Sequence, residues 1–282
     1  MLKTLLIIAL LLSAEDAFGQ SASGNLSVTV TPSGSPTGSG ACPGGNSGFV
    51  PAGYTCNTTL TDEFNGSSLD TSKWTVGWQG SCDPNCVFPP TNPVVSGGNL
   101  QLTSVTNSAA NSTQPGGVYS KSTFPPAPSY WEVRVAIPPD VSYQADWMMD
   151  LVGVPHIEID MQETQFNNQC ANLHDWTAGY TGDLTSSGQP SISGNGCHGN
   201  SNWTDGNFHT YGMHRHVSGG TVVLDFYMDG QLTTTITPSG TNANLFATST
   251  AAMVLQVNSK LVANRADTAL VDYVRVYCPG CQ

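Results

Sequence analysis

Charged side chains are scarce in this 282-residue chain, and positively charged ones are scarcer still. Charged residues make up 10% of the chain, with 8 Lys and Arg against 20 Asp and Glu, which gives a formal net charge of −12. A groove that binds phosphate needs a cationic surface, so we do not expect nucleic acid as a partner. Anionic membrane surfaces are disfavoured for the same reason, whereas neutral polymers such as glucans are compatible.

Long apolar runs are also lacking beyond the N-terminus. There, Lys3 precedes an apolar run from Leu5 to Leu12, and Ala17-Phe18-Gly19 offers small residues to a signal peptidase. This pattern predicts a signal peptide at residues 1–19, and the run is too short to span a bilayer. A buried N-terminal helix is the alternative. We therefore expect a secreted, extracellular protein, monomeric and without a membrane partner.

Ser, Gly, Thr and Pro dominate residues 20–45, which have little to bury and are expected to form a flexible linker. Residues 46–282 are then the folded domain. Eight cysteines in an exported chain favour disulfides, although the sequence alone does not fix their pairing. A zinc site is the alternative for two of the cysteine pairs, Cys82-x3-Cys86 and Cys278-x2-Cys281. The order of the cysteines offers four local pairs: Cys42 with Cys56, Cys82 with Cys86, Cys170 with Cys197, and Cys278 with Cys281.

Sustained helical periodicity is absent after the signal peptide. Short runs of β-branched and aromatic residues alternate instead with Gly, Pro and Asn, at a spacing typical of a sandwich or barrel. Asp229-Gly230 is a strong hairpin-turn signal between Val222–Met228 and Gln231–Ile236. No repeat of fixed period is present, which argues against propellers and solenoids. The sequence therefore predicts an all-β fold, a two-sheet β-sandwich of the jelly-roll type.

Three carboxylates lie close together in an otherwise sparsely charged chain: Glu158, Asp160 and Glu163. On a strand Glu158 and Asp160 share one face, while Ile157, Ile159 and Met161 share the other. Glu163 joins the carboxylate face only if a β-bulge at Met161-Gln162 adds one residue. The two glutamates are then roughly 13 Å apart at Cα, and their carboxyl groups can approach to roughly 5–6 Å, near the separation in retaining glycosidases.

Two other interpretations of this cluster stay open at this point. Hard cations prefer several oxygen ligands, so the three carboxylates could bind calcium. An exposed edge strand could also carry them as a protection against aggregation.

The stretch Glu158-Ile159-Asp160-Met161-Gln162-Glu163 resembles the signature of glycoside hydrolase family 16, jelly-roll enzymes that include laminarinases, lichenases, agarases and carrageenases. The resemblance extends over residues 58–278 in the family's order. It implies a concanavalin-like β-jelly roll with a concave substrate groove. The other segments that carry it are Asp62–Gly66, Leu69–Trp74, Asn92–Leu100, Tyr130–Pro138, Phe208–Tyr211, Phe226–Gly230 and Val271–Tyr277.

The resemblance also implies residue roles. Glu158 is the expected nucleophile, Asp160 the assisting carboxylate and Glu163 the acid/base, and the chemistry requires no cofactor. Trp147 is equally consistent with the core, and His174 with a structural role. The expected groove contacts are Asn92, Trp147 and His174; a structural calcium is expected at Glu63, a carbonyl near Gly98, and Asp272, unless the two acids are a plain surface pair.

The sequence departs from the laminarinase pattern at Tyr143–Asp146, at His214-Arg215, and at Gln256 with Asn258–Lys260. We expect these changes to lie in the groove walls, so the reaction class is firmer than the substrate. The default prediction is an endo-acting, retaining hydrolase of a β-1,3- or β-1,3/1,4-glucan. The alternatives are a galactan hydrolase of the agar or carrageenan type, a transglycosylase of the same fold, a non-catalytic β-glucan-binding protein, and a calcium-binding structural domain.

Overall fold

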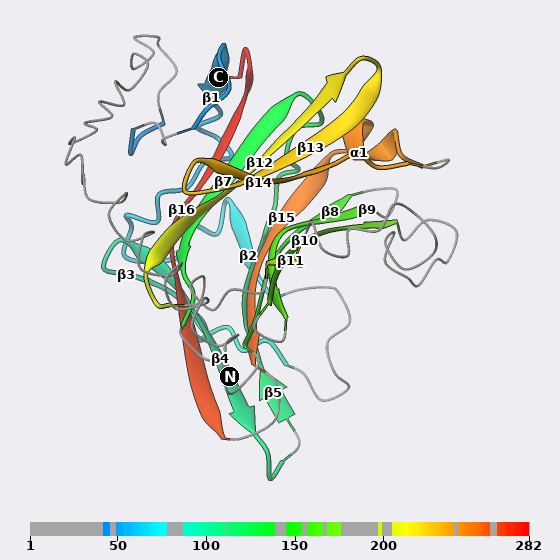
Figure 1. The fold of residues 1–282 in the computed structure, drawn as a ribbon. Coiled ribbons are helices and arrows are strands. Elements are labelled where there is room, and N and C mark those ends of the chain that lie inside the picture. Colours follow the sequence, from blue (N-terminus) through cyan, green and yellow to red (C-terminus); the bar gives the residue numbers. More distant parts are fainter. Residues whose placement is uncertain are drawn as a thin grey trace, which may run out of the picture. The chain divides into compact units, whose positions relative to one another are not determined.

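Antiparallel strands make up most of the folded chain. The computed structural model describes residues 42–45, 49–77, 87–110, 112–138, 145–153, 157–165, 168–175, 197–198, 205–239, 242–259 and 264–281. The strand pairs of these residues are all antiparallel and form two sheets (Figure 1). The predicted signal peptide and most of the predicted linker lie outside the described residues.

Sheet A has nine strands within the described ranges. Their order is β14 (Gln231–Ile236), β13 (Thr221–Met228), β12 (Phe208–Ser218), β7 (Ser129–Ala136), β16 (Arg265–Pro279), β4 (Asn99–Asn107) and β3 (Pro93–Ser96), with β1 (Tyr54–Cys56) beside β16 and β5 (Ser112–Gln114) beside β4.

Sheet B has seven strands in the same part of the chain. Their order is β11 (Cys197–His198), β10 (Asn168–Asp175), β9 (Ile157–Gln165), β8 (Ala145–Gly153), β15 (Ala251–Ser259), β6 (Gly116–Ser120) and β2 (Trp74–Val76). One short helix, α1 (Leu245–Thr248), precedes β15, and none of the described helices could cross a membrane.

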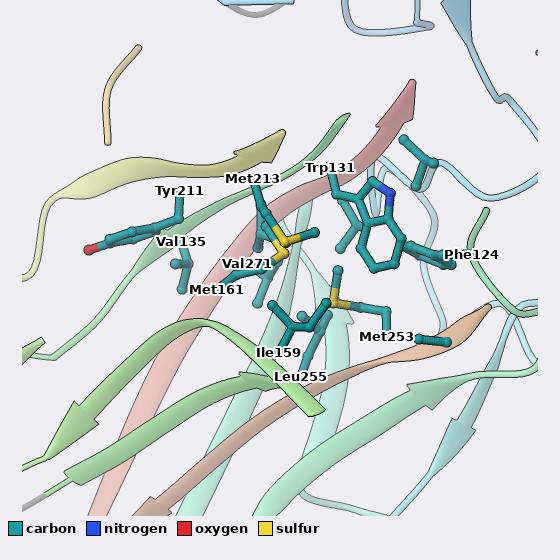
Figure 2. Packing of buried hydrophobic residues seen from close by; sticks show 14 of the residues in the cluster. Phe124, Trp131, Val135, Ile159, Met161, Tyr211, Met213, Met253, Leu255 and Val271 are labelled. Carbon is teal, nitrogen blue, oxygen red and sulfur yellow. The ribbon is translucent and has the colours of Figure 1, made fainter. Parts of the chain in front are cut away.

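The two sheets enclose one apolar core. Alternate residues of β15, namely Met253, Leu255 and Val257, are fully buried and face the other sheet, where Trp131 of β7 meets them (Figure 2). Val254 and Gln256 between them are buried as well, so β15 is covered on both faces. Each apolar side chain of this kind contributes about 1.5–3 kcal/mol by leaving water. The predicted two-sheet sandwich is confirmed.

The predicted hairpin turn between β13 and β14 is also confirmed. Asp229 and Gly230 have φ of 48° and 76°, the left-handed values that a two-residue turn of type I′ requires. Met228 pairs with Gln231 directly across the turn.

Two of the predicted disulfides fall within the described residues and are formed, Cys42–Cys56 and Cys278–Cys281. The second leaves no thiolate there for the zinc alternative. Cys170 and Cys197 are register partners in the β10–β11 pair, and Cys82 and Cys86 lie outside the described residues. Cys42 is buried beside Tyr130 and Tyr277, so the packed domain includes Cys42–Gly45, which the sequence analysis assigned to the linker.

The sheets approach each other closely at Gly116, the first residue of β6. A methyl group there would lie 2.5 Å from the backbone nitrogen of Thr103 and 2.8 Å from its oxygen, and both atoms belong to β4. Because backbone atoms cannot move aside as a side chain does, only glycine fits this contact.

We predict that Gly116→Ala lowers the free energy of unfolding by about 1–3 kcal/mol, since the added methyl forces the sheets apart. Urea unfolding followed by circular dichroism measures the change. Ser67→Ala, at an exposed loop position, is the control and should change stability by less than about 0.5 kcal/mol. Equal stability of Gly116→Ala and wild type would contradict the proposed close contact.

Candidate active site

Strand β9 has one apolar side and one acidic side. Ile157, Ile159 and Met161 are buried in the core between the sheets. Glu158 is half-buried and Asp160 fully buried, and by strand alternation both residues belong to the opposite face of sheet B. The alternation of apolar and acidic residues in the sequence predicted that the two faces of β9 differ, and the structure agrees.

A β-bulge interrupts β9 at the predicted place. Ala171 of β10 lies opposite the two residues between Asp160 and Glu163, because the register moves from Asn172↔Asp160 to Cys170↔Glu163. The register with β8 shifts at the same point. Two residues thus oppose one, which is the definition of a bulge, and the prediction is confirmed.

The bulge returns position 163 to the face that carries positions 158 and 160. On the regular neighbour β8, Val152 lies opposite Glu158 and Met148 opposite Glu163. These partners are four residues apart on one strand and so share a face, at roughly 13 Å between Cα atoms. For Glu163 the structure describes the backbone position, and that position is compatible with a carboxyl pair across one groove.

His174 and Trp147 lie at different kinds of position. His174 is the register partner of Glu158 on β10, which places position 174 on the acidic face of the sheet. Trp147 pairs with Val257, a fully buried core residue, so its register places position 147 on the side that faces sheet A. A sugar contact at Trp147, like its core alternative, stays a prediction.

Asn92 forms hydrogen bonds with the segment that precedes β6 and with β4. Its side-chain amide donates to the carbonyl oxygen of Gln114 at 2.8 Å, and its backbone oxygen accepts from the Thr103 amide at 3.2 Å. Gln114 lies two residues before β6, and β6 is the third strand from β9 in sheet B. Contact between Asn92 and a sugar stays a prediction.

Two further residues belong to the acidic face of sheet B: Gln256, which the sequence predicted in a groove wall, and Phe88, which it did not identify. Gln256 of β15 pairs with Met148 on one side and Gly117 on the other, in the same row as Glu163. It is buried, and among the described residues its side-chain oxygen has no hydrogen-bond partner. A buried carbonyl oxygen that lacks a partner is costly, so this atom is suited to accept a ligand hydrogen bond.

Phe88 is the second. A methyl at Gly117 would lie 2.9 Å from the Phe88 ring, and one at Gly77 would lie 3.7 Å from its Cβ. Gly117 shares the row of Gln256, so the half-buried ring lies over the same face of the sheet. No sequence signal identifies Phe88, because its neighbours come from other strands.

The departure at His214-Arg215 does not lie in the groove wall, contrary to our expectation. Both residues belong to β12 of sheet A. Arg215 is fully buried, with its guanidinium donating to the carbonyls of Phe246 and Ser249 around α1. Burial lowers the pKa of Arg215 to about 10, so it remains charged at neutral pH.

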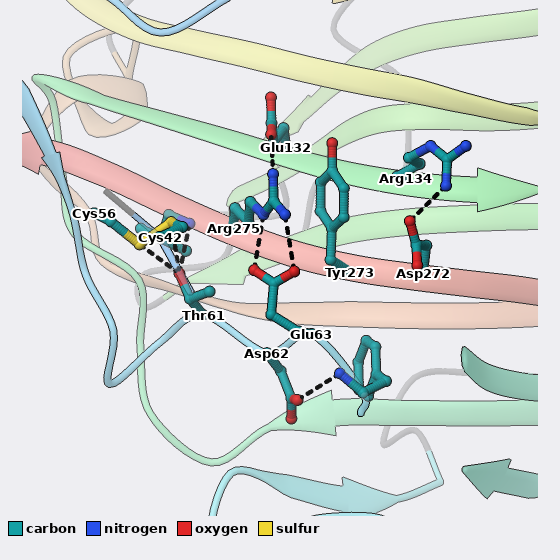
Figure 3. Close-up of polar contacts among 12 residues, drawn as sticks. Cys42, Cys56, Thr61, Asp62, Glu63, Glu132, Arg134, Asp272, Tyr273 and Arg275 are labelled. Atoms are coloured by element: carbon teal, nitrogen blue, oxygen red, sulfur yellow. Dashed lines mark hydrogen bonds and ion pairs between the residues drawn. A yellow bond between two sulfur atoms is a disulfide. The ribbon is translucent and has the colours of Figure 1, made fainter. Parts of the chain in front are cut away.

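The residues of the predicted calcium site are paired with arginines (Figure 3). Arg275 donates to both oxygens of Glu63 at 2.8 Å, and Arg134 lies 2.5 Å from the carboxylate of Asp272. Burial alone would lower the pKa of Arg275, but its hydrogen bonds to Glu63, together with charge interactions with Tyr273, Glu63 and Tyr277, raise it. Calcium needs six to eight oxygen ligands, and a bound guanidinium repels the ion, so this arrangement of Glu63, Gly98 and Asp272 does not fit it.

The chain is similar to proteins of known family and structure. A family model described as "Beta-porphyranase A-D, GH16 domain" matches residues 54–279. No curated protein matches the chain.

Several solved structures share the fold. β-Agarase A from Zobellia galactanivorans is 17% identical, with 81% of this chain and 93% of the agarase covered and a TM-score of 0.65. A β-agarase A structure in complex with oligoagarose is 16% identical, covers 79% of this chain and 92% of its own, and has a TM-score of 0.64. An endo-1,3-β-glucanase from Streptomyces sioyaensis is 21% identical, with 81% and 98% covered and a TM-score of 0.63.

The family match bears out both the resemblance noted in the sequence and the prediction of an enzyme. A retaining mechanism is general to the matched family. The chain belongs to the GH16 domain family of the β-porphyranases A–D, and is therefore a glycoside hydrolase of glycoside hydrolase family 16.

Proposed function

We propose that this enzyme is an endo-acting, retaining hydrolase of a β-linked galactan of the agar or porphyran type. In this proposal Glu158 attacks the anomeric carbon, and Glu163 first protonates the leaving oxygen and then activates water. Asp160, between them, hydrogen-bonds the nucleophile. The observation that supports these roles is the bulged register of β9, which assigns positions 158, 160 and 163 to one face.

The burial of Asp160 supports a division of labour among the three acids. Asp160 is fully buried and Glu158 half-buried, so the two acids differ in their access to a substrate. Retaining glycosidases need carboxyl groups in different roles, because one attacks the anomeric carbon while the other donates and then accepts a proton.

The choice of galactan follows from the family description, which names β-porphyranases, and from the agarase among the structural neighbours. A net charge of −12 favours neutral agarose over porphyran, which carries sulfate groups. A β-1,3-glucan, the default from sequence, is the second candidate, and the name of the Streptomyces sioyaensis enzyme favours it.

We predict that wild type releases reducing ends from agarose or porphyran faster than from laminarin, mixed-linkage glucan or carrageenan. Glu158→Gln should lose at least about 10³-fold in kcat, because it removes the nucleophile and retains the shape. Asp70→Asn, at an exposed carboxylate, is the control and should keep full activity. Binding without cleavage by wild type would support the glycan-binding alternative, and faster cleavage of laminarin would establish the glucan.

Stereochemistry tests the mechanism independently of the polymer. The first product formed should carry the β-anomer, since two successive displacements at one carbon restore its configuration. Proton NMR during the first minutes of hydrolysis, before mutarotation, distinguishes the anomers. An initial α-anomer would mean that water attacks directly, which would rule out Glu158 as a covalent nucleophile.

Gln256 is proposed to bind a sugar hydroxyl beside the reacting unit. Gln256→Leu should lower kcat/KM by about tenfold on the cleaved polymer, because one hydrogen bond contributes about 0.5–1.5 kcal/mol. The control Gln256→Asn keeps an uncharged acceptor oxygen on a shorter side chain and should lose less. An unchanged kcat/KM in Gln256→Leu, with normal folding by circular dichroism, would remove Gln256 from the site.

A further inference from the structure

The outer face of sheet A, which points away from sheet B, carries a cluster of metal-ligating side chains. His214 and His216 alternate on β12 with the core residues Met213 and Arg215, so both histidines lie on the outer face. Asp225 on β13 is the register partner of His214. One ligand atom from each of the three residues lies within 4.8 Å of the others.

The distances among these three residues are close to the distances between the ligands of one coordinated ion. Nε2 of His216 lies 3.0 Å from a carboxylate oxygen of Asp225, and the rings of His214 and His216 stack with their centroids 4.3 Å apart. Tetrahedral ligands at about 2.0–2.1 Å from zinc are roughly 3.3 Å from one another. Small side-chain rotations would therefore bring all three atoms onto one ion.

Neighbouring hydroxyl groups already orient two of the ligands. The Tyr54 hydroxyl lies 2.9 Å from Nε2 of His214, and the Thr235 hydroxyl donates to Asp225 at 2.6 Å. Such outer hydrogen bonds fix ligand direction and are typical of metal sites.

We propose that His214, His216 and Asp225 bind a divalent transition-metal ion of the zinc class. Two imidazoles and one carboxylate suit zinc better than calcium or magnesium, which prefer oxygen ligands alone. The ion would join β12 to β13 and, through Tyr54, to the N-terminal segment that covers this face. It would contribute to stability rather than to catalysis, because it lies on the sheet opposite the carboxylates of β9.

Aromatic side chains and a disulfide cover part of the outer face of sheet A. Phe49 stacks on Tyr227 with ring centroids 4.1 Å apart and meets Tyr130 edge-on, and the Cys42–Cys56 disulfide holds this segment on the sheet. All three ligand residues are half-buried. Partial exclusion of water strengthens an ion–ligand interaction and still leaves a path of entry.

Calorimetric titration of the chelator-treated full chain with Zn²⁺ alone tests the proposal. Wild type should bind one ion per chain, and His216→Ala and Asp225→Asn should lose this binding. Thr235→Val, which removes only the orienting hydroxyl, should weaken it by about tenfold. His209→Ala is the matched control, because His209 lies on the same strand and contacts the carboxylates of Asp205 and Asp229 but is outside the cluster; it should bind as wild type does.

A second readout separates lost binding from lost folding. Zn²⁺ should raise the thermal unfolding midpoint of wild type and His209→Ala but leave that of Asp225→Asn unchanged, with circular dichroism confirming that each variant is folded. Absence of Zn²⁺ binding by wild type, unchanged binding in His216→Ala and Asp225→Asn, or equal binding of Ca²⁺ would overturn the proposal. Hydrolysis should not depend on the ion, so failure here leaves the proposed function untouched.

Discussion

Strand β9 must satisfy two environments at once, and the arrangement of the groove depends on how it does so. Its three core residues, Ile157, Ile159 and Met161, are buried between the sheets, which fixes Glu158 and Asp160 on the other face. If β9 alternated strictly, Glu163 would belong to the face in the apolar core, where an unpaired carboxylate costs on the order of several kcal/mol. The bulge avoids this cost, so one local irregularity serves both folding and the alignment of the acids.

The rest of the groove is tied to β9 through the register of sheet B. One row of positions runs from Gly117 through Gln256 and Met148 to Glu163. Successive strands are about 4.8 Å apart, so this row extends roughly 14 Å across the sheet. A slip of one residue in β15 would turn Gln256 toward the core, so the proposed sugar contact of Gln256 and the packing of the core constrain the same register.

The sequence predicted the features that depend on near neighbours in the chain. The turn at Asp229-Gly230, the two faces of β9 and its bulge all follow from local spacing and backbone preference. Features that depend on which strands lie side by side were predicted less well. Arg275 takes the carboxylate of Glu63, and Phe88 lies over Gly117, and neither of these partners is close in sequence.

The two sheets divide the polar chemistry of the molecule between opposite surfaces. Sheet B carries the acids of β9, whereas the outer face of sheet A carries ion pairs and the histidine cluster. The core between the two sheets is apolar and close-packed. A shift of one strand therefore displaces its neighbours, whereas a change of charge on one surface has little effect on the other. Substitutions on the outer face of sheet A should therefore alter stability with little effect on the acids, because the part of β9 whose side chains are described packs toward that sheet with core residues such as Ile159 and Met161.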